Sequence, residues 1–378
     1  MKGLSRTRIA ASSILLVATT LAVGQGMSDA SVTVTGAGTT VGSWTRLSAM
    51  HSPRLAGAAV RLADGRVLVS GGRAGEVSTD SAEIFDPVAK EWTVTGSLPV
   101  ATRTHSMVLL KSGRVLAAGG EGAGTTAALY LPATGVWKQI SPMPRARFSM
   151  ASTRLPDGRV MFAGGYDANF GYTNDVQIYS PTTRSWRLAA PMPTDSIDGL
   201  ITVTKYGKVV VTGGLASAGV SVYNPATNTW KSAPALPSQR WLGNNQNGVV
   251  LPDGRFVVPG GATEGTAGWT DQALARDPST GRWSELSRLP APSVHAAVAL
   301  AGGRFVLHAG RYPGSAEASV YLPRADRWAP TPLMPTRGLA YGNPVTLADG
   351  SVLVLGGQEI DEFGALVDTD AVLLFRMH

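Results

Sequence analysis

The sequence predicts an all-β fold of seven repeated units, each made of four antiparallel strands. An apolar run that ends in two small residues, usually Gly-Gly, recurs along the chain, and a tryptophan follows each run except the last. Successive tryptophans from Trp44 to Trp328 stand 44 to 53 residues apart. A regular period of this size is typical of proteins that place one small sheet in each repeat. Because the repeats fill the chain from Trp44 onward, we expect one domain there rather than two.

The first two strands of each unit are predicted to form a hairpin. In the first unit, Asp64-Gly65 is a two-residue turn of the kind that tight antiparallel hairpins prefer. The run from residue 67 to 70 is almost wholly apolar, which predicts burial on both faces. The small pairs that end these runs are Gly71-Gly72, Gly119-Gly120, Gly164-Gly165, Gly213-Gly214, Gly260-Gly261, Ala309-Gly310 and Gly356-Gly357.

The third strand ends in an aromatic residue, and the fourth carries the tryptophan. Proline often follows the aromatic residue, as Pro87 follows Phe85 and Asp86, and prevents further pairing. The fifth unit departs from the pattern, because Arg276 stands at the aromatic position. We expect the glycines and tryptophans to be structural, since glycine allows close backbone approach and tryptophan fills space between sheets. The tryptophans are Trp44, Trp92, Trp137, Trp186, Trp230, Trp283 and Trp328.

The two ends of the repeat region complement each other. The last unit, with Phe375, ends before any tryptophan strand, whereas Trp44 comes before the first unit. We therefore predict that the strand around Trp44 pairs as the outer strand of the last unit. This pairing would close a ring of seven four-stranded blades, a β-propeller, over residues 42–378.

The repeated diglycine, aromatic residue and tryptophan resemble the kelch repeat from Trp44 to His378. The resemblance implies a seven-bladed kelch propeller, and in kelch proteins that bind partners, arginines before the first strand line the central mouth. It therefore suggests a rim of arginines that could bind carboxylates or phosphates through forked hydrogen bonds. In the alternative, each arginine caps a turn or pairs with a nearby acid. The arginines in question are Arg54, Arg103, Arg147, Arg240 and Arg337.

The fifth unit is the most irregular and carries a second candidate site. Besides Trp241 and Trp269, it contains a run of amides that includes Asn244 and Asn245. Amides beside an aromatic ring are suited to hydrogen-bonding a sugar or a peptide backbone. A polar channel filled with water would need the same residues.

The first residues predict export. Lys2, Arg6 and Arg8 precede an apolar run over residues 9–23, and small residues follow it. This is the pattern of a signal peptide over residues 1–24, with cleavage as late as residue 30 as an alternative. Residues 25–41 would be a flexible tether. We expect a secreted or periplasmic protein with no stable membrane span once the signal is removed.

Composition excludes several kinds of chemistry. The 378 residues contain no cysteine and five histidines, none of which lies at a ligand spacing from another, so we expect no metal and no cofactor. Copper-radical oxidases with kelch-like propellers resemble this chain around Arg240-Trp241, but their cofactor requires a tyrosine cross-linked to cysteine. The formal net charge is +7, and the basic residues are spread over every repeat, which argues against a nucleic-acid partner.

These observations favour a binding module that holds an acidic protein, peptide or glycan at the central mouth. The alternative is a carbohydrate-active enzyme with a layout similar to the periplasmic kelch epimerase of sialic acid anomers, in which arginine holds the anion and one carboxylate acts on protons. A structural protein of the cell envelope is a third hypothesis. The carboxylates that could serve the enzyme are Asp195, Asp198, Asp271 and Glu359.

Overall fold

The computed structural model describes residues 40–169, 171–215, 217–241, 248–263 and 268–378, and every regular element in them is a β-strand. Within these residues no helix has the length and apolar character needed to cross a membrane. The strands form seven antiparallel sheets of four strands, as the repeats predicted. Small added sheets accompany the first, third and seventh of them.

The first four sheets follow one another along the chain. Their strands are β2 (Ala58–Arg61), β3 (Val67–Ser70), β6 (Ala82–Asp86) and β7 (Glu91–Thr95) in the first; β8 (Ser106–Leu109), β9 (Val115–Ala118), β10 (Ala127–Leu131) and β11 (Val136–Gln139) in the second; β12 (Ala151–Arg154), β13 (Val160–Ala163), β16 (Val176–Ser180) and β17 (Ser185–Leu188) in the third; and β18 (Leu200–Val203), β19 (Val209–Thr212), β20 (Val220–Asn224) and β21 (Thr229–Ala233) in the fourth.

The remaining sheets continue this order until the seventh, which takes its fourth strand from the beginning of the described chain. The strands are β22 (Val249–Val250), β23 (Phe256–Pro259), β24 (Ala273–Arg276) and β25 (Trp283–Glu285) in the fifth; β26 (Ala297–Ala301), β27 (Phe305–Ala309), β28 (Ala318–Leu322) and β29 (Arg327–Pro330) in the sixth; and β31 (Asn343–Thr346), β32 (Val352–Leu355), β35 (Val372–Arg376) and β1 (Ser43–Arg46) in the seventh.

Three short additions extend the connections between second and third strands. They are β4 (Arg73–Ala74) with β5 (Val77–Ser78), β14 (Tyr166–Asp167) with β15 (Gly171–Tyr172), and β33 (Gln358–Ile360) with β34 (Leu366–Asp368) and β30 (Leu339–Ala340).

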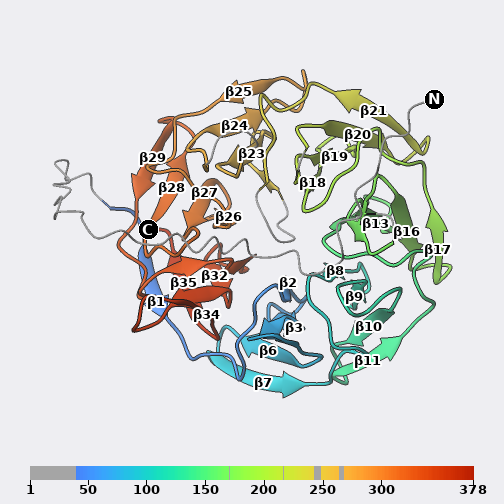
Figure 1. The fold of residues 1–378 in the computed structure, drawn as a ribbon, viewed down its shortest axis with the longest axis horizontal. Coiled ribbons are helices and arrows are strands. Elements are labelled where there is room, and N and C mark those ends of the chain that lie inside the picture. Colours follow the sequence, from blue (N-terminus) through green and yellow to red (C-terminus); the bar gives the residue numbers. More distant parts are fainter. Residues whose placement is uncertain (1–39, 170, 216, 242–247, 264–267) are drawn as a thin grey trace, which may run out of the picture. The chain divides into compact units, whose positions relative to one another are not determined.

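Within residues 40–378, the four strands of each sheet follow one another from the centre outward (Figure 1). In Figure 1 the first strands, such as β2, β8 and β26, lie innermost, and the fourth strands, such as β7, β11 and β25, lie outermost. The second strands are buried along their length, as their apolar sequences predicted. The hydrophobic core lies between neighbouring sheets. One cluster joins Val67 and Phe85 of the first sheet to Leu353 and Leu374 of the seventh.

The tryptophans hold neighbouring sheets together. Trp92 packs on Phe85 of the adjacent strand, with ring centroids 5.1 Å apart, and donates its indole N–H to the carbonyl of Ser48 at 3.0 Å. Trp186 repeats this arrangement with Tyr179 and with the carbonyl of Ser141 in the preceding turn. The structural role predicted for these residues therefore has a visible basis, which is aromatic packing within a sheet and a hydrogen bond to the sheet before it.

The glycine pairs connect each sheet to the next one through a backbone hydrogen bond. The N–H of Gly72 donates to the carbonyl of Thr102 at 2.9 Å, and a Cβ on Gly71 would lie 2.5 Å from that same oxygen. Gly71 also has a φ of +59°, so both space and backbone conformation require glycine. Equivalent bonds join Gly120 to Arg147, Gly165 to Ser196, Gly214 to Arg240, Gly261 to Ser293 and Gly357 to Arg54.

The structure corrects the assignment of the sixth small pair. Ala309 is the last residue of β27, as Ser70 is the last residue of β3. Gly310 therefore occupies the place of the first glycine, and Arg311 takes the second and donates its N–H to Leu339. The sixth unit keeps the glycine that a side chain would crowd, because a Cβ on Gly310 would lie 2.5 Å from the carbonyl of Leu339.

Candidate binding site

One residue of left-handed backbone precedes the first strand in six of the seven sheets. We call these the entrance residues: Ala56, Thr104, Ser149, Asp198, His295 and Tyr341, with φ between +50° and +58°. This conformation is uncommon for residues other than glycine and is often retained where a ligand binds. In the fifth sheet the corresponding segment, 242–247, lies outside the described residues.

Backbone hydrogen bonds link the entrance residues of neighbouring sheets. The N–H of Thr104 donates to the carbonyl of Ala56 at 2.8 Å, and the N–H of Ser149 donates to Thr104 at 3.1 Å. Asp198 donates to Ser149 at 3.1 Å, and Tyr341 donates to His295 at 2.9 Å. The repeats thus fix these backbones rigidly, whereas their side chains differ from one sheet to the next.

A cavity of about 280 Å³ adjoins the entrance residues and follows the first strands. Ala56 and Tyr341 line it at the entrance, and uncharged side chains such as Met107, Ser152 and Asn343 line it further along. Its volume lies near the lower end of the range for small-molecule sites, roughly 300 to 1,000 Å³. The cavity could hold one side chain or one sugar ring.

Aromatic side chains gather beside the entrance at the fifth, sixth and seventh sheets. The edge of Trp241 meets His295 at a centroid distance of 4.7 Å, and His295 stacks on Tyr341 at 4.0 Å. Tyr312 lies 6.1 Å from Tyr341 and 5.7 Å from Trp269, nearly perpendicular to both. We call Trp241, Trp269, His295, Tyr312 and Tyr341 the aromatic cluster. Trp269 is 38% exposed, so the cluster reaches solvent.

The electrostatics of the aromatic cluster are set by burial and by one carboxylate. Burial lowers the pKa of His295 to about 3, so the imidazole is neutral near pH 7. Burial also raises the pKa of Tyr341, which keeps its phenol protonated. The indole N–H of Trp241 donates to a carboxylate oxygen of Asp198 at 3.3 Å. The cluster therefore offers apolar ring surfaces, hydroxyl groups and one negative charge.

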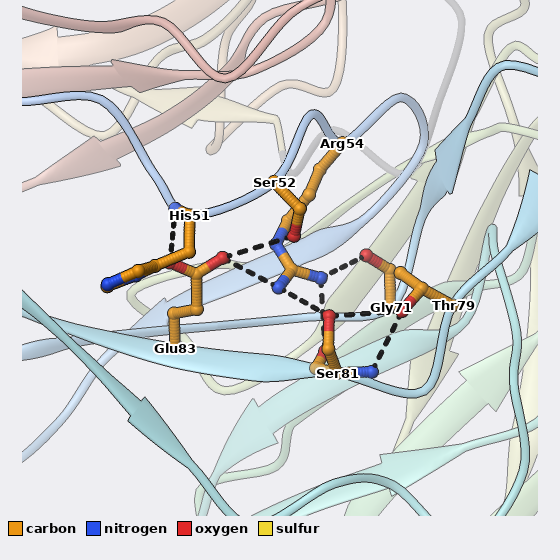
Figure 2. A network of polar contacts seen from close by, with 7 residues as sticks. All are labelled: His51, Ser52, Arg54, Gly71, Thr79, Ser81 and Glu83. Carbon is orange, nitrogen blue, oxygen red and sulfur yellow. Dashed lines mark hydrogen bonds and ion pairs between the residues drawn. The ribbon is translucent and has the colours of Figure 1, made fainter.

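The structure places Arg54 inside the first sheet, away from solvent. Figure 2 shows its guanidinium group surrounded by Ser81, Glu83 and the carbonyl of Gly71. It donates to Glu83 and to the Ser81 hydroxyl at 2.8 Å each, and to the Gly71 carbonyl at 2.8 Å. Glu83 also accepts hydrogen bonds at 2.7 Å from the backbone and from the ring of His51. Arg54 is 3% exposed, so its charge is compensated within the protein.

Arg147 and Arg240 occupy the equivalent places in the third and fifth sheets. Arg147 is 3% exposed and pairs with Asp167 at 2.8 Å and with Asp175. Arg240 is 1% exposed and donates to Gln272 and to the Gly260 carbonyl. Burial lowers the pKa of Arg240, and the negative charges of Glu285 and Asp271 only partly oppose this shift.

The five arginines do not share one structural position. Arg103 stands one residue beyond the place of Arg54, because Thr102 receives the glycine bond that Arg54 receives in the first sheet. Its partly exposed guanidinium group forms two hydrogen bonds to Glu121, at 2.8 and 2.7 Å. Arg337 is exposed and lies two residues before Leu339, which receives that bond in the seventh sheet. The structure therefore does not bring the set together as one rim.

The other sequence candidates fall in different surroundings. Trp241 belongs to the aromatic cluster, whereas Asn244 and Asn245 lie outside the described residues. Asp195 is exposed, and Asp271 pairs with Arg288 at 2.8 Å. Glu359 is held by Arg46, Thr336 and Thr369, so only Asp198 joins the entrance.

His295, Tyr312 and Tyr341 were not singled out as binding residues from the sequence. The only signal was positional: His295 and Tyr341 stand two residues before the first strands begin, where other units carry alanine, threonine, serine or aspartate. Among the described residues, no group of three His, Cys, Asp or Glu side chains is arranged to hold a metal ion.

Comparison with known proteins supports a kelch-repeat protein with a propeller-like all-β fold. Residues 54–99 and 147–193 match the kelch motif. The solved structure of a fungal alcohol oxidase of the AA5 family, in complex with copper, is similar with a TM-score of 0.71. The similarity covers 89% of this chain and 77% of that one at 16% identity, so it concerns the fold alone. None of the curated proteins matches this chain in sequence.

Proposed function

We propose that residues 42–378 form a closed seven-bladed propeller that works as a binding module. Three observations support closure: β1 pairs with β35, Gly357 donates to Arg54, and one core cluster joins the seventh sheet to the first. Closure leaves only the short outer strands as sheet edges, and the surface that we assign to a partner is the entrance at the first strands.

The observation that carries the binding function is the aromatic cluster at this entrance. Its rings come from three consecutive sheets and include His295 and Tyr341, whose backbones are hydrogen-bonded to each other, and Tyr341 lines the cavity. Rigid aromatic side chains give large contact area at a low cost in conformational entropy, which is why they dominate binding sites. Kelch motifs are also consistent with an interaction module.

The partner is a peptide segment of another exported or surface protein, or a glycan. Both offer apolar faces for the rings and polar groups for the hydroxyls of Tyr312 and Tyr341 and the carboxylate of Asp198. The acidic partner expected from the arginines has weaker support, because Arg54 and Arg147 already hold internal carboxylates. Export rests on the signal-like residues 1–24 alone.

A thermal-shift screen of the full chain against neutral and acidic oligosaccharides and peptides tests this function, because a ligand of the native state raises the apparent melting temperature. We expect a shift that disappears in a Trp269→Ala, Tyr312→Ala double variant and persists in Tyr206→Ala. Tyr206 is a matched control because it is 58% exposed and lies in the β18–β19 turn, at the other end of β18 from Asp198. A shift that persists in the double variant would refute the site.

One observation favours a second candidate, a carbohydrate-active enzyme of the same entrance. Asp198 is a carboxylate beside the aromatic side chain of Trp241 at the entrance, and an acid–base residue of a sugar-acting enzyme needs a carboxylate within reach of the bound sugar. Turnover of a sugar found in the screen, abolished by Asp198→Asn with binding retained, would establish it. Binding without turnover in the native chain would leave the binding module.

A further inference from the structure

The fold collects the basic residues of the repeats on one face. The turns between first and second strands, each taken with the last residue of its first strand, are residues 61–66, 109–114, 154–159, 203–208, 250–255, 301–304 and 346–351. In an antiparallel sheet these turns lie at the opposite end of the first strands from the entrance residues. We call this the turn face.

Contacts between neighbouring sheets show that the turns adjoin one another. Lys111 donates to the carbonyl of Pro156 at 2.8 Å, and Arg154 donates back to the carbonyl of Leu109 at 2.9 Å. The N–H of Gly302 donates to the carbonyl of Gly350 at 2.8 Å. Arg159 reaches Pro225 in the β20–β21 turn at 3.4 Å, so the turns between third and fourth strands share this face.

The turn face carries a large uncompensated positive charge. The seven segments between first and second strands contain ten Lys or Arg and four Asp residues, and the turns between third and fourth strands add four Lys or Arg and two Asp residues. Three of the four Asp residues between first and second strands are occupied within their own turns, as Asp64 is by Arg66 at 2.7 Å and Asp157 by Arg159 at 2.6 Å. The other seven bases of these segments form no ion pair with a described residue. Six of them are exposed: Arg61, Lys111, Arg114, Arg154, Lys205 and Arg304.

The entrance side differs in this respect. Arg103 is paired with Glu121, Arg311 with Glu317, and Arg147 with two aspartates. Most of the positive charge on the entrance side is therefore paired, with Arg240 and Arg337 as exceptions, whereas the exposed bases at the opposite end of the first strands form no ion pair within the described part of the chain. Basic residues that recur at similar positions of the repeats are spread evenly along the sequence, but they lie together on one face of the folded protein.

We propose that the turn face docks onto a lipid bilayer that carries anionic headgroups. Each Lys or Arg near such a surface strengthens binding about fivefold, so six exposed bases provide substantial binding. The proposal is independent of the ligand at the entrance, which would face away from the membrane.

The distribution of the charges favours a planar anionic surface over a linear polyanion. The six exposed bases come from the first, second, third, fourth and sixth sheets, so they surround the centre of the face instead of following one track. Two apolar side chains also project here: Tyr206 is 58% exposed, and Val88, in the β6–β7 turn, is 90% exposed. The headgroup region of a bilayer accepts such side chains, whereas a polyanion offers them no apolar partner.

Vesicle sedimentation of the full chain tests the proposal. The probes are phosphatidylcholine vesicles and vesicles of phosphatidylcholine with 30% phosphatidylglycerol. The test variant replaces Arg61, Lys111, Arg154, Lys205 and Arg304, one exposed base from each of five sheets, with glutamine. The matched control replaces Lys138, Arg187, Lys231, Arg327 and Arg337, which are exposed on the outer strands or on the entrance side. Both variants lose five positive charges and keep the same N-terminal residues, whose own vesicle binding is measured with the neutral vesicles.

We expect strong salt-dependent binding to the anionic vesicles and weak binding to the neutral ones. The five-residue turn variant should lose roughly 100-fold or more in partitioning at an unchanged melting temperature, because each base contributes about fivefold. The control variant should retain most of its binding. Equal loss in both variants would show that only net charge matters and would overturn the proposal. Binding to heparin without binding to anionic vesicles would overturn it in favour of a linear polyanion.

Discussion

Trp44 and Phe375 face each other across the pairing of β1 with β35, with ring centroids 5.0 Å apart. Trp44 lies near the beginning of the described residues, and Phe375 lies near their end. Their contact repeats the tryptophan and aromatic pair found within other sheets, such as Tyr130 with Trp137. The same local packing that stabilises one sheet therefore joins the two ends of the chain.

Replacing Trp44 with alanine should lower the free energy of unfolding by about 3 kcal/mol, because it removes a large aromatic side chain at this junction. The indole hydrogen bond to the hydroxyl of Thr331, at 3.0 Å, is lost as well. Urea denaturation measures the change, with Tyr206→Ala as the exposed control, and hydrogen exchange should show reduced protection in β35. An unchanged denaturation curve for Trp44→Ala would contradict the proposed closure.

The contact between sheets at the glycine pairs can be tested with two glycines of similar backbone conformation. Gly71 and Gly75 have φ values of +59° and +62°, but only at Gly71 would a Cβ meet other atoms, 2.5 Å from the carbonyl of Thr102. Gly75→Ala should cost about 1 to 2 kcal/mol for the left-handed backbone alone. Gly71→Ala should cost clearly more, measured by the same denaturation curves. Equal costs would mean that backbone conformation, and not contact between sheets, requires the glycine.

Arg54 should behave as a structural residue. Removing one partner of a buried ion pair leaves the other charge uncompensated, so Arg54→Ala should destabilise the protein by about 3 to 5 kcal/mol. The matched control is Arg103→Ala, whose ion pair with Glu121 is partly exposed and should contribute less than about 1 kcal/mol. Similar melting temperatures for the two variants would contradict this assignment.

Lowering the pH should destabilise the protein already at pH values above those at which carboxylates become protonated. Burial lowers the pKa of His105 to about 4, of His295 to about 3 and of His308 to about 4. The unfolded chain binds protons on these residues below about pH 6.5, whereas the folded chain does not until the pH is far lower. Stability is therefore complete above pH 6.5 and falls as the pH decreases toward 4, by about 2 kcal/mol per histidine at pH 5.

The buried carboxylates titrate below the pH range in which the histidines reduce stability. The pKa values of Glu83 and Glu359 are lowered in the folded protein, so their contribution is lost only below about pH 4.5. Denaturation curves of the native chain and of His308→Gln at pH 7.5 and 5 separate the effects. The variant should show a smaller loss between the two values, and an equal loss would show that His308 is not kept neutral by folding.

The repeats made much of the fold predictable. The hairpin turns, buried second strands and tryptophan strands each depend on a few neighbouring residues, and seven copies reinforced every weak signal. The sixth unit was misaligned by one residue because Ala309-Gly310 resembles a softened glycine pair, although contact with Leu339 requires glycine only at Gly310.

The site was much less predictable. Arg54 and Arg103 look alike in sequence, but one faces into a sheet and the other lies at the surface, because they stand one residue apart in the repeat. The aromatic cluster combines Trp241, His295 and Tyr341 from three units, and no single unit shows the pattern. The positive turn face was missed for the opposite reason: its basic residues recur in nearly every unit, and this even spacing along the sequence was taken as evidence that they do not cluster.

Hydrogen exchange of the full chain, with and without a ligand from the thermal-shift screen, tests the binding site most directly. We predict that the ligand slows exchange in peptides that contain Trp241, His295, Tyr312 and Tyr341, and leaves exchange in the β18–β19 turn around Tyr206 unchanged. Protection confined to the turn face or to the outer strands, with none at the entrance, would contradict the account.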